Sequence, residues 1–507
     1  MKKLVKKIFL LFTLHFLLFT FLDANTLNLS MSSSPSRLNP ILANDSASSE
    51  VSDWLFNGLF KYNKDGKVVV DLAKSYNFNS NTKLIIKLRK NVLWHDGKKF
   101  TSKDVVFTYN SIKNPKIYTT ILSNFIKVKS VKALDDYTIE VIYNEPYFKA
   151  LEIWMVGILP YHIYKDEKDM MKSKFNKNPI GTGSYKLKKF KNGEDIRLVA
   201  NDDYFEGRPK IDEILYTFLP DPTTAFLMLK QNKLDIGSLT PLQIDRQIKQ
   251  KFKDEHKIIE KQSFGYTYLG FNLRTEKFKD LKVRQALSMA INREELVNIL
   301  YFGHAKVCHG PFLPGSFAFN KDIVSPKQNL EKAKKLLKEA GYDENNPLSF
   351  EVVTNTGNDI RINAAQIIQY QLEKIGVHMK IRVMEWQAFL NTVVLPKNFE
   401  AVVLGWGLSL MPDAYSIWHS SSDKKGGFNF VGYNNKKVDS LIEKGAVTIN
   451  RDKLGEIYKK IFKHISEDVP YLFLYIANSI TVVNDNIKNI EPAFIGITHN
   501  QKDWVKP

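Results

Sequence analysis

At two places in the sequence, histidine, cysteine and acidic residues are close enough for acid–base or metal chemistry. His95 and Asp96 are adjacent, and Cys308 and His309 follow shortly after His304. Adjacent residues on a turn rarely face one another, and Asp96 precedes a glycine, which supplies the positive φ that many turns need. We therefore expect the first pair to support the fold and the second group to lie on a surface loop.

Elsewhere the sequence lacks the motifs of the common enzyme classes. It contains no Ser/His/Asp order with supporting context, no nucleophile elbow, no zinc-protease helix and no pair of cysteines. Residues 181–183, Gly-Thr-Gly, lack the third glycine, or the Gly-Lys-Ser/Thr ending, of a phosphate-binding loop. We therefore predict that the protein is not an enzyme and needs no catalytic cofactor.

The segment 84–109 has the pattern of a strand, an aromatic-rich turn and a capped helix. Leu84, Ile86 and Leu88 recur at every second position, which is typical of a half-buried strand. Thr101 or Ser102 can cap a following helix, whose first turn contains an aspartate favoured by the helix dipole.

Strands and helices alternate along the rest of the chain, which predicts an α/β protein with two lobes. Asn192-Gly193 joins two strands as a hairpin. Residues 210–219, 220–234 and 235–237 have the patterns of strand, helix and strand, and this order predicts a parallel crossover. In the second half, helices should stop at Gly341 and Gly376, and strands are expected at 377–383, 399–406 and 471–485.

Residues 1–24 have the pattern of a secretory signal peptide, with four lysines followed by an apolar run from Ile8 to Leu22. This run of about 15 residues is too short for a membrane span of roughly 20. No cysteine stands at the expected cleavage site to carry a lipid anchor. We therefore predict a soluble periplasmic protein.

The composition is consistent with an exported globular protein. The single cysteine, Cys308, excludes an internal disulfide, so stability must come from a buried core. The formal net charge is +19, and loss of the four signal lysines and Asp23 would lower it to +16. Because the lysines stand in short groups among acids, we interpret them as solvated faces and do not expect nucleic acid as a partner.

Two segments, LRKNVLWHDGKKFTSKDVVFTY at 88–109 and residues 179–240, resemble the family 5 extracellular solute-binding proteins of ABC importers. That family takes up peptides, nickel chelates and opines. The resemblance covers nearly the whole chain and implies the two-lobe periplasmic binding protein fold, with a ligand cleft between the lobes. Lobe I would comprise residues 25–264 and 477–507, with an inserted subdomain at about 60–175, and lobe II would comprise residues 265–476.

Residues 404–420, LGWGLSLMPDAYSIWHS, resemble the family's cleft segment, in which a tryptophan at a strand end stacks on the ligand. Trp406 matches that position. Peptide-binding relatives often have an aspartate three residues later, where this chain has Ser409. Asp413 either replaces that carboxylate as the partner of a ligand ammonium group or caps a helix beginning at Ala414. Tyr415 is a further candidate for ligand binding.

The tail segment 490–500, IEPAFIGITHN, resembles the part of the family that lies along the cleft near the ligand of nickel-binding relatives. His499 could therefore complete the coordination of Ni²⁺ held as an amino-acid chelate, because imidazole suits nickel and the chelator supplies the other ligands. Otherwise His499 is a solvated surface group. Thr498 is its neighbour at the expected site, and His419 is the second candidate metal ligand.

Nickel-binding relatives can hold the chelator's carboxylates with arginines, but the segment that would align, residues 152–164, contains none. Arg37 or His162 would then have to recognise a carboxylate. Trp154 and Tyr118 would add aromatic surface that suits either a chelate or a peptide side chain.

From these residues we expect a monomeric periplasmic receptor that delivers its solute to the permease subunits of an inner-membrane ABC importer. The expected cargo is a nickel–amino-acid chelate, for example nickel with histidine, so that Ni²⁺ would be the transported ligand. A di- or oligopeptide is the alternative cargo. A periplasmic hydrolase or chaperone that uses the same cleft is a more remote alternative.

Overall fold

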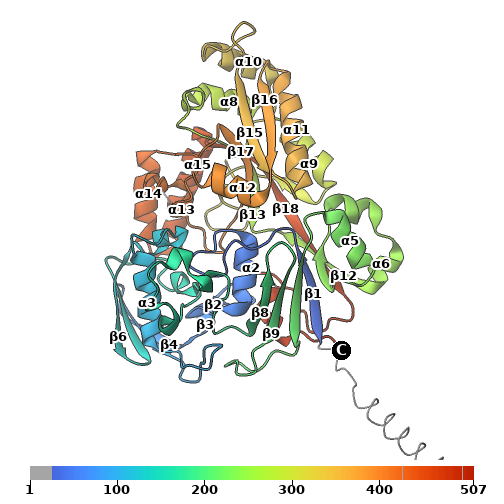
Figure 1. Ribbon diagram of the computed structural model, residues 1–507. Helices are drawn as coiled ribbons and strands as arrows, with labels where there is room; N and C mark the ends of the chain where they lie inside the picture. The colour runs from blue at the N-terminus through green and yellow to red at the C-terminus, as the bar shows by residue number, and fades with distance from the viewer. Residues whose placement is uncertain (1–24, 425, 494) are drawn as a thin grey trace, which may run out of the picture.

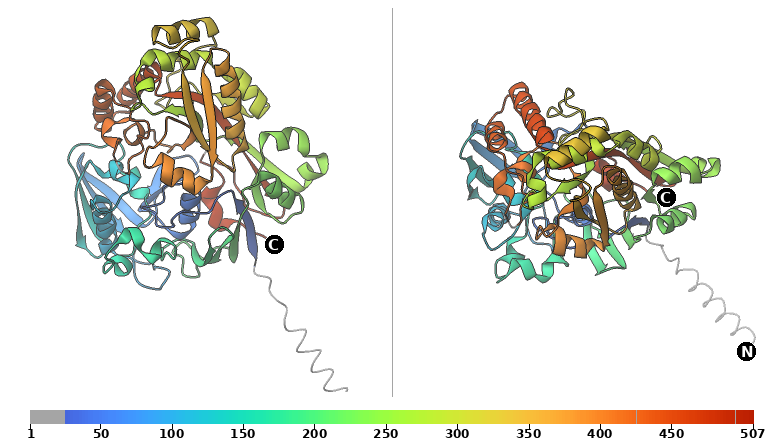
Figure 2. Two further views of the ribbon diagram at one scale, coloured as in Figure 1. Left: turned by 45° about the horizontal axis from the view of Figure 1, so that its top comes forward. Right: turned by 90° about the horizontal axis from the view of Figure 1, so that it is seen from above.

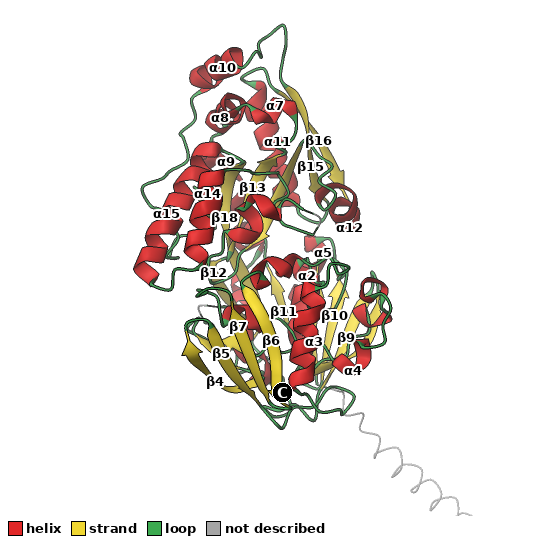
Figure 3. Cartoon of the chain, turned by 90° about the vertical axis from the view of Figure 1, so that its left-hand side faces the viewer, coloured by secondary structure: helices red, strands yellow, loops and turns green. Residues whose placement is uncertain are grey.

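The computed structural model describes residues 25–424, 426–493 and 495–507, so the expected signal peptide lies outside the described residues. Two lobes lie one above the other, lobe II at the top of Figure 1 and lobe I below it. Figure 3 shows the same division from the side. The predicted α/β, two-lobe fold is thus confirmed. Among the described helices, none is both long and apolar enough to cross a membrane.

The centre of lobe I is a four-stranded sheet with the strand order β1-β10-β9-β8. β1 and β10 are parallel, and β9 pairs antiparallel with both neighbours. The predicted hairpin joins β8 and β9, and Gly193 at its turn has φ +78°. The strands are β1 (Thr26–Met31), β8 (Tyr185–Lys191), β9 (Asp195–Ala200) and β10 (Glu213–Phe218), and helix α2 (Ser46–Leu55) contacts β8.

A second sheet in lobe I has the order β4-β5-β7-β6, and its strand β5 leads into residues 88–109, one of the two segments that carry the family resemblance. β5 (Lys83–Leu88) and α3 (Ser102–Lys113) confirm the predicted strand and helix, and Thr101 forms a capping box with Asp104. His95 Nδ1 accepts a hydrogen bond from the backbone N–H of Gly181, which is the supporting role expected for it. The other elements here are β2 (Phe60–Tyr62), β3 (Val68–Val70), β4 (Ala73–Ser80), β6 (Val128–Asp135), β7 (Thr138–Tyr143) and α4 (Tyr161–Tyr164).

An eight-stranded sheet forms the centre of lobe II and continues into lobe I, with the order β11-β18-β13-β17-β15-β16 and with β12 and β14 also paired to β18. β15, α11 and β16 form a parallel crossover, and Gly376 follows α11 with φ +76°, as predicted. The strands are β11 (Ile236–Ser238), β12 (His256–Gln262), β13 (Gly265–Phe271), β14 (Ala305–Val307), β15 (Ser349–Asn355), β16 (His378–Met384), β17 (Ala401–Gly407) and β18 (Tyr471–Asn484).

Helices cover this sheet in lobe II, and two further helices lie beside its lobe I end (Figure 1). Two large groups of buried apolar side chains form the core of lobe II, and a separate large group fills lobe I. The helices are α5 (Pro222–Lys230), α6 (Gln250–Glu255), α7 (Glu276–Lys279), α8 (Leu281–Ala290), α9 (Arg293–Tyr301), α10 (Leu330–Glu339), α11 (Asp359–Glu373), α12 (Trp386–Phe389), α13 (Tyr415–Trp418), α14 (Lys436–Ala446) and α15 (Arg451–Asp468).

β18 connects the two lobes. Its first half pairs with β13 and β14, and its second half pairs with β12 and β11. The pairing partners of β18 change between Ala477 and Asn478. The chain then continues into lobe I, where its end lies near β1 (Figure 2) and Lys506 Nζ donates to the carbonyl of Thr26 at 2.7 Å.

The parallel crossover predicted for residues 210–237 is wrong. β10 has β1 as its parallel partner, whereas β11 pairs antiparallel with β18 in the other sheet. The long strand β18 leaves an edge in lobe I, and α5 packs there with it in a small core that contains Leu229, Ile480 and Val482. Burial of this apolar face favours the pairing of β11 with β18.

Candidate functional site

A cavity of about 740 Å³, here called the main cleft cavity, lies between the two lobes. Lobe I contributes residues 43–46 at the start of α2, the short helix Thr120–Phe125 and Lys149. Lobe II contributes the ends of β13 and β17, the start of α11 and residues 428–430. Because both lobes form its walls, the cavity can close around a solute when the lobes move together.

Aromatic rings form one wall of the main cleft cavity. Trp406 lies near the end of β17, as expected from the sequence, and its half-buried ring lines the cavity. The ring stacks on Phe430 at a centroid distance of 5.4 Å and meets Phe428 edge-on at 5.3 Å. Trp406 Nε1 donates to the hydroxyl of Tyr471 at 3.3 Å. These contacts fix the orientation of an indole whose remaining surface can stack on a ligand.

The cavity also exposes a strand edge. β17 pairs with β13 along its whole length, but its ladder with β15 covers only Ala401 and Val402. Residues 404–407 continue past that ladder and line the cavity. A side chain at Gly407 would meet open space, which shows how accessible the backbone is there. The unpaired backbone groups of this edge can hydrogen-bond to an extended ligand backbone.

Arg361 is a cavity-lining residue that sequence reasoning missed. Its Nη1 donates to Asn355 Oδ1 at 2.6 Å, whereas its buried Nε has no hydrogen-bond partner within the described structure. Burial lowers the pKa of this guanidinium, and the titratable groups that act on it are the hydroxyls of tyrosines, Tyr475 and Tyr268 foremost, rather than carboxylates. Arg361 is therefore available to bind a carboxylate of the ligand.

One signal in the sequence could have identified Arg361. The residue stands in the first turn of α11, where Asn358 caps the helix by accepting from the backbone N–H of Arg361 at 3.0 Å. A cation at a helix N-terminus opposes the helix dipole. Departures from such local rules are expected to concentrate at functional sites.

An ion pair crosses the cavity between the lobes. Lys149 Nζ lies 2.7 Å from Asp413 Oδ2, and the two side chains are only 8% and 12% exposed. Lys149 also donates to Asn124 Oδ1 at 2.9 Å. Asp413 Oδ1 also accepts from the backbone N–H of Tyr415, the first residue of α13, at 2.9 Å, although the N-cap position itself is occupied by Ala414. The carboxylate considered as a clamp for a ligand ammonium group thus already has a cationic partner.

Residues 408–413, here called the cleft loop, follow β17 directly and end at Asp413. Ser409 lines the cavity, and its hydroxyl donates to the carbonyl of Met411 at 2.6 Å. The backbone N–H of Leu408 donates to the carbonyl of Phe264 at 2.6 Å, which holds the start of the loop against β13. The loop thus has both a fixed start and a fixed end.

Two other candidates from the same stretch pack against each other beside the loop. The ring of Tyr415 stacks on His419 at 4.3 Å, and its hydroxyl lies 2.9 Å from Ser421 Oγ. His419 is buried, and its Nε2 lies 3.3 Å from Glu443 Oε1. Among the described residues, the walls of the main cleft cavity include neither ring.

Four predicted ligand contacts from lobe I stand apart from those walls. Trp154 is fully buried in the lobe I core, where its Nε1 donates to the hydroxyl of Tyr143 at 3.0 Å. His162 pairs with Asp96 at 2.8 Å. Tyr118 is exposed, and the backbone N–H of Arg37 donates to Ser48 Oγ at 3.3 Å.

Thr498 and His499 line a different cavity, of about 750 Å³, here called the lobe I cavity. His499 Nε2 lies 2.9 Å from the carbonyl of Glu491. Glu50 and Asp53 line the same space, and burial raises the pKa of Asp53 to about 7, with the charge of Glu50 adding to the effect. Within the described residues no group of three or more His, Cys, Asp or Glu side chains could hold a metal ion, although a chelated ion would need only one.

Comparison with known proteins shows the family and the fold to which this chain is similar. The model of the bacterial extracellular solute-binding proteins, family 5 Middle, matches residues 67–428. The oligopeptide-binding protein AppA of Bacillus subtilis (strain 168) is 36% identical over 473 residues, which are 90% of this chain and 86% of AppA.

Solved structures of two relatives have the same fold. The structure of AppA from Bacillus subtilis in complex with a nonapeptide has a TM-score of 0.90 and 33% identity, and the match covers 95% of this chain and 99% of that chain. NikZ from Campylobacter jejuni in complex with Ni(L-His) has a TM-score of 0.85 and 31% identity, with 95% and 100% covered. These relatives are named for binding or for the ligand they hold, not for catalysis. The resemblance noted in the sequence is confirmed, and the chain belongs to family 5 of the bacterial extracellular solute-binding proteins.

Proposed function

We propose that this protein is the periplasmic receptor of an ABC importer and that it captures a peptide and delivers it to the permease subunits of the inner membrane. The observation that supports a peptide best is the unpaired edge of β17 at residues 404–407, inside the main cleft cavity. A peptide backbone can extend the sheet at such an edge by hydrogen bonds that do not depend on its sequence. We propose that the receptor acts as a monomer.

The side chains around this edge suit the rest of a peptide. Trp406 offers the face of its ring for stacking. Arg361 offers N–H groups to a carboxylate, either the C-terminus of the peptide or an acidic side chain. A peptide ammonium group would have to compete with Lys149 for Asp413. The carboxylate is therefore the charged group for which this cavity is best prepared.

A nickel–amino-acid chelate, the cargo expected from the sequence, is the second candidate. The similarity to NikZ in complex with Ni(L-His) favours it, and Arg361 could equally hold the carboxylate of a chelating amino acid. However, the described walls of the main cleft cavity contain no histidine, and His499 lines the lobe I cavity instead. A peptide needs no such ligand, so we place the peptide first.

Mass spectrometry of ligands released from the purified protein tests the choice directly. Recovered peptides would support the proposal, whereas nickel with free histidine, together with a thermal shift by Ni²⁺ plus histidine that is lost in His499→Ala, would overturn it.

Titration calorimetry with a recovered peptide tests the site. Arg361→Gln should weaken binding about tenfold to a hundredfold, because a hydrogen bond to a charged group contributes ~1.5–3 kcal/mol. Arg382→Gln is the matched control. Arg382 lies on the edge strand β16, where it is exposed and pairs with Glu351 of β15. Equal affinities of the two variants would show that Arg361 does not contact the ligand.

A further inference from the structure

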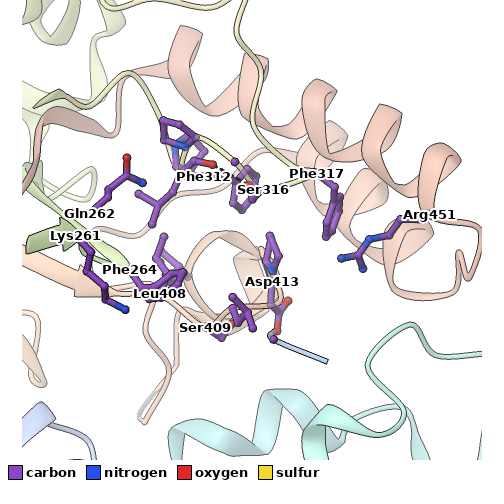
Figure 4. Close-up of a pocket in the computed structure, with 18 of the residues that line it drawn as sticks. Lys261, Gln262, Phe264, Phe312, Ser316, Phe317, Leu408, Ser409, Asp413 and Arg451 are labelled. Carbon is purple, nitrogen blue, oxygen red and sulfur yellow. Dashed lines mark hydrogen bonds between the residues drawn. The ribbon is translucent and has the colours of Figure 1, made fainter. Parts of the chain in front are cut away.

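A second cavity, of about 460 Å³, adjoins the cleft loop and is here called the apolar cavity (Figure 4). It lies between residues 311–317 and the start of α15 on the lobe II side and residues 66 and 493 on the lobe I side. Its size falls within the range of cavities that hold small ligands, about 300–1,000 Å³. Half of the residues in its walls are aromatic, leucine or proline residues, a larger share than in the main cleft cavity.

The two cavities share a wall. Leu408, Ser409 and Asp413 of the cleft loop line both. The apolar cavity therefore begins where the open edge of β17 ends, since Leu408 follows Gly407 directly. A ligand that lies along this edge comes within reach of the second cavity at the cleft loop.

Cations stand at both ends of the apolar cavity, Lys261 at one end and Arg451 at the other (Figure 4). The guanidinium of Arg451 lies 4.1 Å from the ring centroid of Phe317, and its Nη1 lies 3.1 Å from Met411 Sδ. Lys261 Nζ lies 5.1 Å over the ring of Phe264, and burial lowers its pKa.

Two acidic groups, Asp413 and Glu152, lie near the apolar cavity. Asp413 is the one carboxylate in the described walls of the apolar cavity, and it pairs with Lys149. Glu152 of lobe I is close enough for Arg451 to lower its pKa, but burial outweighs this and raises the pKa overall. An apolar space with cationic ends disfavours a lysine or arginine side chain, which would lose hydration and meet like charge.

We propose that the apolar cavity is a specificity pocket that takes one large apolar side chain of the peptide and places an adjacent acidic group at Arg451. The inference rests on the proposed peptide function and adds the kind of peptide. The apolar side chain gains from burial against Phe264, Phe312 and Phe317. The acidic group forms a charge-assisted hydrogen bond with the guanidinium.

Binding from a defined peptide library tests this pocket. The probe is an alanine-based nonapeptide library in which two adjacent positions vary among Phe, Leu, Ala, Asp, Glu and Lys, and mass spectrometry measures which members the full-length mature protein retains. We expect members with Phe or Leu next to Asp or Glu to be enriched about tenfold over members with Lys. This factor is near the low end of the discrimination that one chemical group in a pocket provides.

Two variants and one control separate the pocket from general binding. Arg451→Glu should reverse the preference between acidic and basic neighbours, and Ser316→Phe should remove the preference for Phe and Leu by filling the cavity from its wall. Lys460→Glu makes the same charge change at an exposed position of α15 and should leave the enrichment unchanged. Thermal unfolding of each variant confirms that it is folded.

The outcomes distinguish this inference from the function on which it rests. Retained peptides without an apolar or acidic preference, or an Arg451→Glu variant that behaves like Lys460→Glu, would overturn the specificity pocket and leave the peptide receptor in place. Failure to retain any library member, while Ni²⁺ with histidine binds, would overturn both.

Discussion

Replacing Lys149 with methionine should shift the ligand-free protein toward an open arrangement of its lobes. Lys149 belongs to lobe I and Asp413 to lobe II, so their ion pair exists only when the lobes are close. The variant keeps a similar side-chain length but leaves Asp413 without its cation. Opening the cleft would hydrate this carboxylate and so reduce the free-energy cost of a buried charge without a partner.

The size of the effect follows from distance and burial. At 2.7 Å and an effective dielectric constant of about 20, the Coulomb attraction is ~6 kcal/mol before desolvation is counted. Much of this is cancelled by the cost of removing both charges from water, but breaking such a pair on one side still costs ~3–5 kcal/mol when the other charge stays buried. Because opening relieves part of that cost, we expect ~2–3 kcal/mol, or about 30- to 150-fold in the closed-to-open ratio.

Small-angle X-ray scattering and pulsed electron–electron distance measurements between one label on each lobe would measure the opening. Asp413→Asn should have a similar effect, and the double variant Lys149→Met/Asp413→Asn should cost less than the sum of the two single changes. Lys64→Met serves as control, because Lys64 pairs with Glu491 within lobe I, 3.0 Å away, where both side chains are about half exposed.

Additive single effects would refute this reasoning. So would an unchanged distance distribution in Lys149→Met, since the closed arrangement would then depend on contacts other than the ion pair between the lobes.

Three further predictions concern single residues. Trp406→Ala should weaken ligand binding by about 1–3 kcal/mol, the usual cost of truncating an aromatic anchor, while Trp406→Phe should weaken it less; calorimetry measures both. Burial raises the pKa of the Cys308 thiol to about 12, so the folded protein should react with a thiol reagent only slowly and the unfolded protein rapidly. The pKa of Asp53 is raised to about 7 in the folded state, which means that the stability it contributes is present below pH 4 and is lost as the pH rises through 7. Asp53→Asn should therefore unfold at a higher temperature than the wild type at pH 8 and at the same temperature at pH 4, and equal differences at both pH values would contradict this assignment.

Local signals in the sequence were sufficient for the elements that depend on neighbouring residues. The alternation in β5, the cap of α3 at Thr101 and the hairpin at Asn192-Gly193 all arise within a few residues, and all appear in the structure as predicted. The pairing of β11 could not be predicted from its neighbours, because it depends on a strand almost 250 residues later in the chain. Local patterns describe such an element but not its partner.

The residues of the site also differ in whether the neighbouring sequence was enough to place them. Trp406 could be placed because the resemblance extends along its own strand, and it lines the main cleft cavity. Lys149 could not, because its partner Asp413 is far away in the sequence and on the other lobe. Trp154 is of a residue type that often binds ligands, yet it is fully buried in the lobe I core. Burial separates an aromatic core residue from an aromatic contact, and burial is a property of the whole fold.

The charges in the main cleft cavity indicate which ligands it suits. Asp45 caps α2 and accepts from the backbone N–H of Ser48 at 2.9 Å, so the helix N-terminus compensates its charge. Lys149 and Asp413 compensate each other. Of the four charged residues that line the cavity within the described chain, Arg361 is left without an opposite charge. A cavity balanced in this way should favour a ligand that brings a carboxylate, which both a peptide and an amino-acid chelate do. The choice between them therefore depends on the groups that Arg361 does not reach, namely the open edge of β17 for a peptide backbone and His499 for a metal ion.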